Sequence, residues 1–406
     1  MKRWPEVELG SRCEVFSGYP FKSAQFTEDP DDVALVKGEN VGQGEILWEI
    51  SKRWPREDAE DLCRYRLEPD DVVLAMDRPW VPAGLKFAQI RASDPEALLV
   101  QRVARLRAFD GLDQNFLYCV IGSPEFVAYI KNIGRGVGVP HISGKQIGEY
   151  LLRLPPPQVQ RSIADILSAY DDLIENNRRR MALLEEAARQ LYREWFVRLR
   201  FPGHEHTRIT NGVPEGWDDC RVRDFGQVVT GKTPSTKEAG NYGGDIPFIK
   251  TPDMHGNVFV VETEASLTDT GANTQPGKFI PPNTLLVSSI GTVGIVSMTS
   301  ARAQFNQQIN AVVPFEGTYG CYLFFALRDL KEAMEAIGGG ATMSNVNKTK
   351  FESLKVVKPA VSLLHEFQEF CAPLFQQIQG LSVQNLRLRS ARDLLLPRLM
   401  SGDIVV

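Results

Sequence analysis

Residues 158–199 read QVQRSIADILSAYDDLIENNRRRMALLEEAARQLYREWFVRL, and their apolar side chains recur every three or four positions. This spacing places them on one narrow face of an α-helix about 60 Å long. A narrow face maintained over so many turns is typical of a coiled-coil seam, which needs a partner helix. The predicted seam residues of this segment are Ile163, Ile166, Tyr170, Leu173, Asn177, Leu184 and Leu191.

A second segment, near the end of the chain, carries the same spacing and is the obvious partner. Asn177 and Asn385 both fall on the seam, where a buried Asn usually fixes the register of the two helices. Pro373 and Gly380 interrupt the second segment, so we expect a kink or break there. Its predicted seam residues are Leu364, Phe367, Leu374, Ile378, Leu381, Asn385, Leu388 and Leu395.

The parts of the chain that precede these helices resemble each other. Val33–Lys37 matches Ile246–Lys250, and Leu67–Leu74 matches Ile280–Val287, with both pairs 213 residues apart. The spacing differs elsewhere, which indicates insertions and deletions between the copies. The chain is therefore one module written twice, and a twofold relation between the copies would make the two long helices antiparallel.

Each copy begins with a segment rich in Gly, Pro, Val and Ile, in which Val72–Ala75 and Leu285–Ser288 are predicted strands. Short helices are predicted at Ser123–Asn132 and Tyr319–Ile337. The predicted fold class is α+β, with two similar, β-rich mixed α/β domains joined by two long antiparallel coiled-coil helices. The predicted segments are domain 1 (1–153), a central helical region and linker (154–207), domain 2 (208–357) and a distal helical region (358–406).

Composition narrows the class of protein. No run of eighteen apolar residues is present in the 406 residues, so we expect no membrane span, and the first residues do not resemble a signal peptide. The six cysteines lie tens of residues apart without a CxxC pair, so we expect reduced thiols and a cytoplasmic location. The net charge of −5 excludes a uniformly basic DNA-binding protein but not one with locally clustered cations.

Three chemical motifs are weaker than they look. Gly226–Thr233 matches the phosphate-binding G-x-x-x-x-G-K-T pattern, but Pro234 and nearby glycines disfavour the helix that such a loop requires, so we predict a turn between strands. Pro155–Gln158 lacks the flanking residues of an amino-methyltransferase motif. His204 and His206 lie in a polar linker without a third ligand, so we predict no metal site and no catalytic residues.

Basic and amide side chains cluster in the predicted loops of both copies. Arg and Lys pair with guanine, Asn and Gln pair with adenine, and Lys holds phosphates, so these residue types are typical of DNA recognition. The clusters around Arg135–Lys145 and Asn345–Lys350 recur at equivalent places in the two copies. The predicted DNA-binding residues are Lys22, Arg78, Lys86, Arg135, His141, Lys145, Lys232, Lys250, Thr292, Gln307, Gln308, Asn345, Asn347, Lys348 and Lys350.

The chain resembles the specificity subunits of type I restriction–modification systems over nearly its whole length, because several of its motifs follow one another in the order found in that family. The resemblance rests on Gly231–Ser235 followed by Gly244–Phe248, on Gly291–Gly294, and on Gln304–Ile309. It also rests on the helix opening Pro155–Gln160 and the closing Leu394–Gly402. The first copy departs from the pattern, because Asp77–Trp80 stands where the second has Ile290–Val293. Such divergence is expected if each domain recognises a different base sequence.

The resemblance implies a non-catalytic subunit with two target-recognition domains, each recognising one half of a bipartite asymmetric double-stranded DNA site. It implies that the helices set the spacing of the halves and bind two modification (methyltransferase) subunits, to which restriction subunits attach. S-adenosylmethionine, ATP and Mg²⁺ would be bound by those partners, so this chain would carry no cofactor. The complex as a whole would methylate adenine and cleave DNA with ATP.

Three alternatives stay open at this point. A coiled-coil scaffold with two protein-binding domains explains the long helices but not the amide-rich loops. A stand-alone bispecific DNA-binding protein would bind tightly without partners. An NTPase would need the Gly226–Thr233 segment to act as a phosphate-binding loop.

Overall fold

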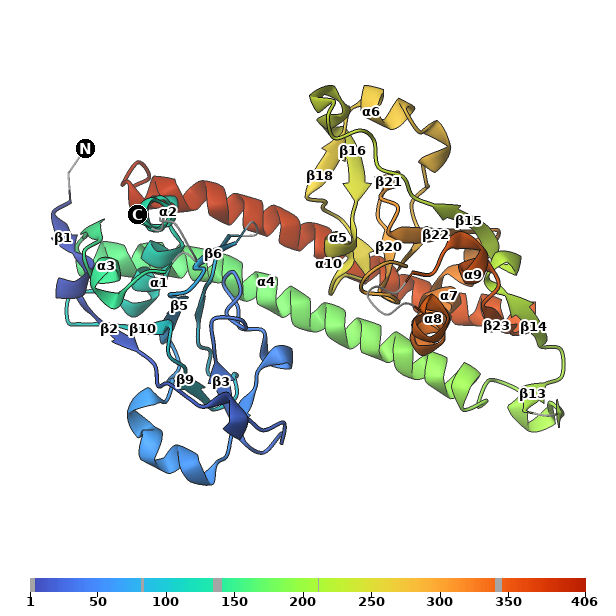
Figure 1. The fold of residues 1–406 in the computed structure, drawn as a ribbon, viewed down its shortest axis with the longest axis horizontal. Coiled ribbons are helices and arrows are strands. Elements are labelled where there is room, and N and C mark those ends of the chain that lie inside the picture. The colour runs from blue at the N-terminus through green and yellow to red at the C-terminus, as the bar shows by residue number, and fades with distance from the viewer. Residues whose placement is uncertain (1–3, 82–83, 134–140, 211, 340–344) are drawn as a thin grey trace. The chain divides into compact units, whose positions relative to one another are not determined.

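The computed structural model describes residues 4–406 except 82–83, 134–140, 211 and 340–344 (Figure 1). The chain forms two compact units. Unit 1 comprises Met1–Asp172 and Arg389–Val406, and unit 2 comprises Leu173–Leu388. The unit boundaries therefore fall inside the two long helices, α4 (Pro157–Tyr192) and α10 (Val361–Met400), so each unit contains a part of both helices.

Unit 1 contains a four-stranded antiparallel sheet of order β2-β10-β5-β8, a three-stranded sheet of order β4-β3-β9, and the pairs β1-β11 and β6-β7. Its helices before α4 are α1 (Gln114–Gly122), α2 (Pro124–Ile133) and α3 (Gly144–Gly148). Its strands are β1 (Glu6–Glu8), β2 (Cys13–Ser17), β3 (Val33–Val36), β4 (Arg53–Trp54), β5 (Val72–Ala75), β6 (Trp80–Val81), β7 (Gly84–Leu85), β8 (Phe87–Gln89), β9 (Ala97–Leu99), β10 (Val103–Ala108) and β11 (Leu151–Arg153).

Unit 2 contains a five-stranded sheet of order β15-β22-β19-β20-β17, a three-stranded sheet of order β18-β16-β21, and the pairs β12-β13 and β14-β23. Its helices are α5 (Thr251–Met254), α6 (Asp269–Asn273), α7 (Gly320–Asp329), α8 (Lys331–Gly338) and α9 (Lys348–Glu352). Its strands are β12 (Ile209–Thr210), β13 (Val213–Pro214), β14 (Asp218–Arg221), β15 (Gly226–Thr230), β16 (Tyr242–Ile249), β17 (Phe259–Val260), β18 (Ala265–Leu267), β19 (Leu285–Ser288), β20 (Val296–Thr299), β21 (Gln304–Phe305), β22 (Ile309–Pro314) and β23 (Lys355–Lys358).

The two units share one topology, which confirms the internal repeat. The antiparallel order β2-β10-β5-β8 is repeated as β15-β22-β19-β20, and the parallel pair β3-β9 is repeated as β16-β21. The pairs β1-β11 and β14-β23 are both antiparallel. Unit 2 adds β17 as a parallel edge strand beside β20. The predicted strands Val72–Ala75 and Leu285–Ser288 are β5 and β19.

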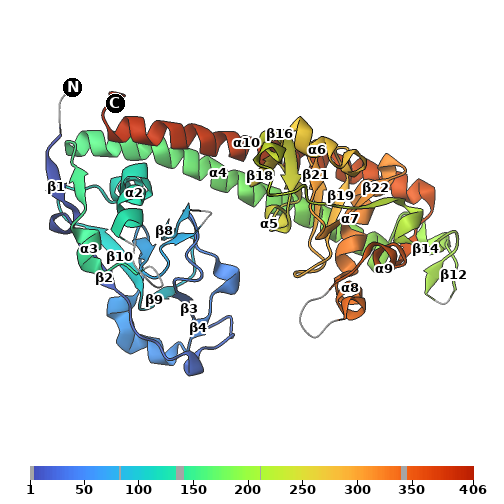
Figure 2. The same cartoon turned by 45° about the horizontal axis from the view of Figure 1, so that its top comes forward.

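Alternating side chains of the central strand β5 pack into two different cores of unit 1. Val72 and Leu74 face a core built with α1, α2 and the first turns of α4. Val73 faces a second core, built with β3 and β9. This is the period of two that a strand buried on both faces requires. Figures 1 and 2 show β3 and β9 on the side of unit 1 away from α4.

Strand β19 repeats this division in unit 2. Leu285 and Val287 pack with α7 and both long helices, whereas Leu286 packs with β16 and β21. The predicted helix Tyr319–Ile337 is resolved into α7 and α8, which meet at Leu330. Each unit therefore presents a sheet with helices on one face and a smaller sheet on the other.

The long helices run antiparallel within each unit, as predicted. In unit 1 the first turns of α4, with Ile163 and Leu167, share a core with Leu399 at the end of α10. In unit 2 the end of α4, with Tyr192, shares a core with Phe367 near the start of α10. A π-helical turn, Arg193–Val197, follows α4 directly.

The break expected in the second helix and the seam position of Leu173 are both wrong. Helix α10 continues without a break through Pro373 and Gly380, because the buried side chains of Cys371 and Phe375 hold its turns against unit 2. Such packing can outweigh the loss of one backbone hydrogen bond. Leu173 is 39% exposed and does not lie on the seam. The neighbouring residue Ile174 is buried and takes the seam position that was predicted for Leu173.

The phosphate-loop motif takes the conformation expected of a strand and turn. Gly226–Thr230 forms β15, and residues 231–235 are not helical. The Lys232 amide donates to Phe305 O at 3.0 Å and so is not available to a phosphate. Among the described residues, none of the helices combines the length and the apolar character that a membrane span requires.

Candidate nucleic-acid interface

Three loops of unit 1 meet where β5 ends and β10 begins. The Met76 amide donates to Arg102 O at 2.8 Å, and the Ile142 amide donates to Met76 O at 2.9 Å. An antiparallel bridge joins Asp77 to His141 beside them. Backbone hydrogen bonds therefore hold together segments that lie far apart in the sequence.

The same three loops meet in unit 2, where β19 ends and β22 begins. The Ser289 amide donates to Gln308 O at 2.7 Å, and the Val346 amide donates to Ser289 O at 2.9 Å. The matching bridge joins Ile290 to Asn345. Three backbone contacts at equivalent positions in the two copies show that this junction belongs to the repeated module.

A fourth loop approaches the junction so closely that only glycine fits. A Cβ added to Gly18 would lie 2.4 Å from Leu99 O, and one added to Gly231 would lie 2.0 Å from Asn306 O. We call the four loops of each unit its loop junction. The loop junctions comprise residues 18–22, 76–79, 101–102 and 141–142 in unit 1, and residues 231–235, 289–292, 306–308 and 345–346 in unit 2.

A buried amide ties the unit 2 loops together. Asn310 is 1% exposed, and its Nδ2 donates to Ser289 Oγ at 2.8 Å and to Val346 O at 3.0 Å. Its Oδ1 accepts from Thr230 Oγ1 at 2.6 Å. The equivalent position in unit 1 is Ala104 on β10, so the two junctions are fixed by different side chains.

The exposed side chains of the unit 2 junction are mostly amides and hydroxyls. Gln307 accepts a hydrogen bond from Thr233, which links two of the loops. Gln308 Oε1 accepts from Asn306 Nδ2 at 3.0 Å. Thr292 is exposed beside them. Such groups both donate and accept hydrogen bonds, as the edges of bases require.

The unit 1 junction carries charges instead. Arg102 Nη1 donates to both carboxylate oxygens of Asp77, at 3.0 and 2.9 Å, and a ring nitrogen of His141 lies 2.6 Å from Asp77 Oδ1. Although burial alone would raise it, these hydrogen bonds from His141 and Arg102 hold the pKa of Asp77 below its ordinary value. Burial, with Arg78 nearby, lowers the pKa of Lys86.

Ten predicted residues lie on or directly beside a loop junction. They are Lys22, Arg78, Lys86 and His141 in unit 1, and Lys232, Lys250, Thr292, Gln307, Gln308 and Asn345 in unit 2. Lys250 follows Ile249, whose carbonyl accepts from the Asn306 amide at 3.0 Å, and its Nζ lies 3.1 Å from a Glu264 oxygen.

The other predicted residues lie just beyond the junctions. Lys145 is on α3, 3.8 Å from Glu149, and Lys348 is on α9, 3.4 Å from Glu352. Asn347 caps α9 by accepting from the Lys350 amide at 3.0 Å, and Lys350 Nζ donates to Ile337 O at 2.8 Å. Arg135 lies outside the described residues.

Sequence reasoning missed three residues of the unit 1 junction: Asp77, Gln101 and Arg102. A signal was present, because β10 and β22 are 206 residues apart, and this spacing pairs Gln101 and Arg102 with Gln307 and Gln308. Extending the internal alignment to this stretch would have found both residues. The contact of Asp77 with Arg102 had no signal, because it depends on how the loops meet in space.

The seam between the long helices includes the two predicted asparagines. Asn177 Nδ2 donates to Asn385 Oδ1 at 2.9 Å, and Asn385 Nδ2 donates to Ile174 O at 3.1 Å. Both side chains are buried. Hydrogen bonds between paired buried amides satisfy polar groups only in one register, so they specify how the helices align within unit 2.

The remaining predicted seam residues differ in burial. Fully or nearly buried are Ile163, Leu364, Phe367, Ile378 and Leu381. Half-buried are Ile166, Tyr170, Leu184, Leu191, Leu374, Leu388 and Leu395. Leu173 alone of the predicted seam residues is exposed.

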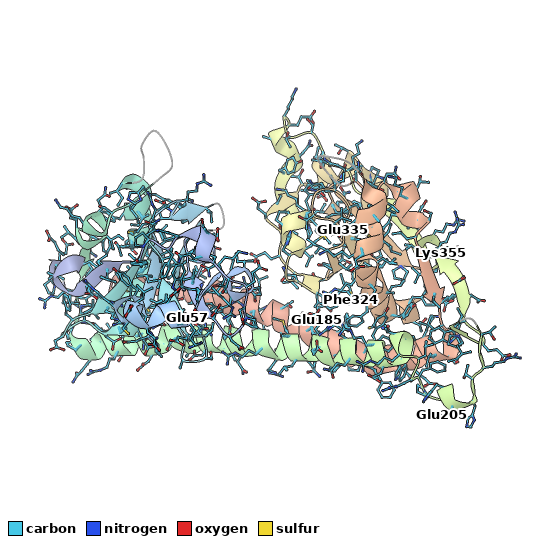
Figure 3. The ribbon with its side chains drawn as sticks, turned by 60° about the horizontal axis from the view of Figure 1, so that its bottom comes forward. Glu57, Glu185, Glu205, Phe324, Glu335 and Lys355 are labelled. Atoms are coloured by element: carbon cyan, nitrogen blue, oxygen red, sulfur yellow. The ribbon has the colours of Figure 1, made fainter. Side chains whose placement is uncertain are left out.

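Ion pairs join the long helices to each other and to the rest of their unit. Figure 3 labels Glu185 on α4 and Phe324 on α7; Arg328 of α7 pairs with Glu185, and its guanidinium lies 4.2 Å from the centre of the Phe324 ring. Arg392 of α10 pairs with Asp171 of α4 in unit 1. Among the described residues, no group of three or more His, Cys, Asp or Glu side chains could hold a metal ion.

Comparison with known proteins places this arrangement in context. The family model of the type I restriction modification DNA specificity domain matches residues 1–186 and 214–363, one match for each copy of the repeat. The chain is 30% identical over 353 residues to the type I restriction enzyme HindI specificity subunit of Haemophilus influenzae, which covers 71% of this chain and 77% of that protein.

More distant relatives extend the similarity over almost the whole chain. The type I restriction enzyme MjaIX specificity subunit of Methanocaldococcus jannaschii is 25% identical, with 93% of this chain and 86% of that protein covered. A solved structure, the S subunit of a type I restriction–modification system from M. genitalium, superposes with a TM-score of 0.57 over 98% of this chain and 96% of its own. At 14% identity, that likeness concerns the fold.

Proposed function

The chain belongs to the type I restriction–modification DNA specificity family, and on this premise we propose that each unit recognises one half of a bipartite DNA site through its loop junction. The observation that carries the proposal is the duplicated junction itself. The same backbone contacts recur in both units, yet the exposed side chains differ, with arginine and histidine in one and amides in the other. A shared scaffold with different side chains suits two different half-sites.

The chemistry of the side chains indicates which junction residues would recognise bases and which would contact phosphates. Arg, Asn and Gln distinguish bases by bidentate hydrogen bonds, whereas Lys mainly contacts phosphates. We assign base recognition to Arg78, Gln307 and Gln308, and phosphate contacts to Lys22 and Lys232. The long helices, which pass from one unit into the other, would set the spacing between half-sites.

The partners in this proposal are double-stranded DNA, two modification subunits bound to the helices, and restriction subunits attached to them. S-adenosylmethionine would be bound by the modification subunits, and ATP with Mg²⁺ by the restriction subunits. The chain would contribute sequence selection and spacing, while adenine methylation and ATP-dependent cleavage would belong to the partners. Because the chain carries a net charge of −5, we expect it to bind DNA weakly alone and tightly with modification subunits.

A binding experiment tests the phosphate contacts. In the complex with its modification subunits, Lys232→Ala should weaken binding to specific and unrelated DNA alike, and reduce the slope of log affinity against log salt by about one. Lys355→Ala is the matched control, because this exposed lysine lies on β23, outside the loop junction (Figure 3). Equal slopes of log affinity against log salt for the two variants would show that Lys232 does not contact a DNA phosphate.

A footprint tests the bipartite arrangement. The complex should protect two short DNA segments with an unprotected gap between them, while the chain alone should give weak protection. A scaffold without DNA affinity would protect nothing, and a stand-alone DNA-binding protein would give the full footprint without partners. Either result would replace the proposal.

A further inference from the structure

We propose that Arg102 recognises a guanine in the half-site of unit 1 and that Asp77 is the positioning residue that orients it. This rests on the proposed function of the loop junctions and adds to it a specific base and a specific side chain. Neither residue is among the DNA-binding residues predicted from the sequence. Four features of the junction carry the proposal: position, geometry, charge and backbone conformation.

Arg102 holds the position that Gln308, a proposed base-recognition residue, holds in the other copy. Its carbonyl accepts from Met76, as the carbonyl of Gln308 accepts from Ser289. Both residues lie just before an inner strand of the sheet, β10 in unit 1 and β22 in unit 2. Arg102 therefore occupies in unit 1 the place that Gln308 occupies in unit 2.

The geometry leaves one edge of the guanidinium available. Only Nη1 takes part in the hydrogen bonds that the described residues make with this group, 3.0 and 2.9 Å from the two Asp77 oxygens. Nε and Nη2 are thus the donors that remain, and the side chain is 58% exposed. Two parallel donors match the O6 and N7 acceptors that guanine presents in the major groove.

The charge beside Arg102 favours a base over a phosphate. Asp77 also lies against His141, so one carboxylate faces two potential donors and holds their orientation. Its negative charge repels a phosphate that approaches the same guanidinium, because like charges a few ångströms apart repel. The neutral edge of a guanine meets no such repulsion. An arginine held by a carboxylate is therefore better suited to base recognition than to general DNA attraction.

The backbone at this junction is unusual for arginine. Arg102 has φ of +67° and Arg78, on the neighbouring loop, has φ of +44°. The residue that stands in place of Arg78 in unit 2 is Gly291, with φ of +78°, for which this conformation is unstrained. Non-glycine residues in this region are strained, and such strain concentrates at functional sites. Unit 1 keeps arginine where glycine would fit more easily.

The two units should therefore differ in the bases that they recognise. Gln308 Oε1 accepts from Asn306 with one of its two lone pairs, so the second lone pair and the amide nitrogen remain to face a ligand. An amide has no charge and pairs best with adenine, whereas a guanidinium pairs best with guanine. We expect the unit 1 half-site to contain a guanine whose recognition depends on Arg102. The unit 2 half-site should contain no guanine whose recognition depends on Gln308.

The experiment maps methylated adenines across the genome of a host that carries the complete system with either wild-type chain or Arg102→Ala. The wild type should methylate one bipartite motif. With Arg102→Ala, one guanine in one half should become degenerate, with about 5- to 100-fold loss of discrimination, while the other half stays unchanged. Arg153→Ala is the matched control, since this arginine of unit 1 is 59% exposed and pairs with Glu6 on β1, outside the junction.

Binding by purified complexes tests Asp77 as well. It also tests Arg102 if the Arg102→Ala variant abolishes methylation in cells. Binding is measured on the wild-type site and on three sites with the guanine replaced. Arg102→Ala should bind all four equally, Asp77→Asn should discriminate less than wild type, and Asp77→Glu should recover most discrimination. A merely structural role for Asp77 would lower the melting temperature without changing the ratio of affinities.

The outcomes separate the two proposals. A wild-type chain that yields no bipartite motif would overturn the proposed function. A bipartite motif that Arg102→Ala leaves fully specific, or loosens in both halves, would overturn the assignment of Arg102 alone. Retained preference for guanine in the purified Arg102→Ala complex would do the same.

Discussion

At the scale of single residues, two glycines decide whether the loop junctions can close. Gly18 and Gly231 hold equivalent places, and each lies against the backbone of the loop that leads into β10 or β22. A side chain there would collide with backbone atoms, which cannot rotate away as a flexible side chain can. The junction thus depends on the absence of a side chain as much as on the amides and arginines around it.

Gly231→Ala should destabilise the protein by about 2 kcal/mol or more, because its Cβ would lie 2.0 Å from Asn306 O. Gly277→Ala is the control in the same unit, since an added Cβ there meets no atom within 4 Å. Chemical denaturation of both variants checks the expectation. Equal stability would mean that the fourth loop does not lie against Asn306.

At the scale of elements, the seam between the long helices consists mostly of packed apolar side chains and includes one hydrogen-bonded polar pair. Asn177 and Asn385 lie among buried apolar side chains, where an amide without its partner is costly. The pair gives up some stability relative to two apolar residues and gains a defined register.

Asn177→Leu and Asn385→Leu should each destabilise the chain by about 1–3 kcal/mol, because each removes one side of a buried hydrogen bond. The double variant should cost much less than the sum of the two single variants, since neither amide is then left behind. A double-mutant cycle in urea measures the coupling. Additive effects would show that the two amides act independently.

Helix α10 continues through Pro373, which lies in its interior and is exposed. Pro373→Ala restores a backbone donor and removes a clash with the preceding turn, so we expect the free energy of unfolding to rise by as much as about 3 kcal/mol. Gln377→Ala, an exposed change one turn later, serves as control and should have little effect. A loss of stability in Pro373→Ala would indicate that the ring makes contacts that the chain needs.

The elements also show what local sequence could and could not predict. The strands β5 and β19 were predicted residue for residue, because a short, mostly apolar run between turn signals leaves little choice. Leu173 and Ile174 are adjacent apolar residues, so spacing alone could not decide which one faces the partner helix. Pro373 misled the prediction because packing against Cys371 and Phe375, which is tertiary, outweighed a local preference.

At the scale of the whole molecule, the internal repeat could be predicted from the sequence. The residues of the loop junctions could be predicted only in part. The 213-residue spacing relates β2 to β15 and β5 to β19, and it carries most of the fold. The contact between Asp77 and Arg102 joins loops 25 residues apart, and it follows from how the sheet brings those loops together. The proposed function therefore rests on one module, used twice, with different side chains on the same junction.

A chain in which the module of unit 1 is replaced by a second copy of the module of unit 2 tests this account most directly. Residues 218–358 would take the place of residues 6–153, which the shared topology allows at matched strands. In a host with the partner subunits, mapped methylation should change from a motif with two different halves to one whose halves are the same sequence. An unchanged motif would contradict the claim that each unit recognises its own half-site.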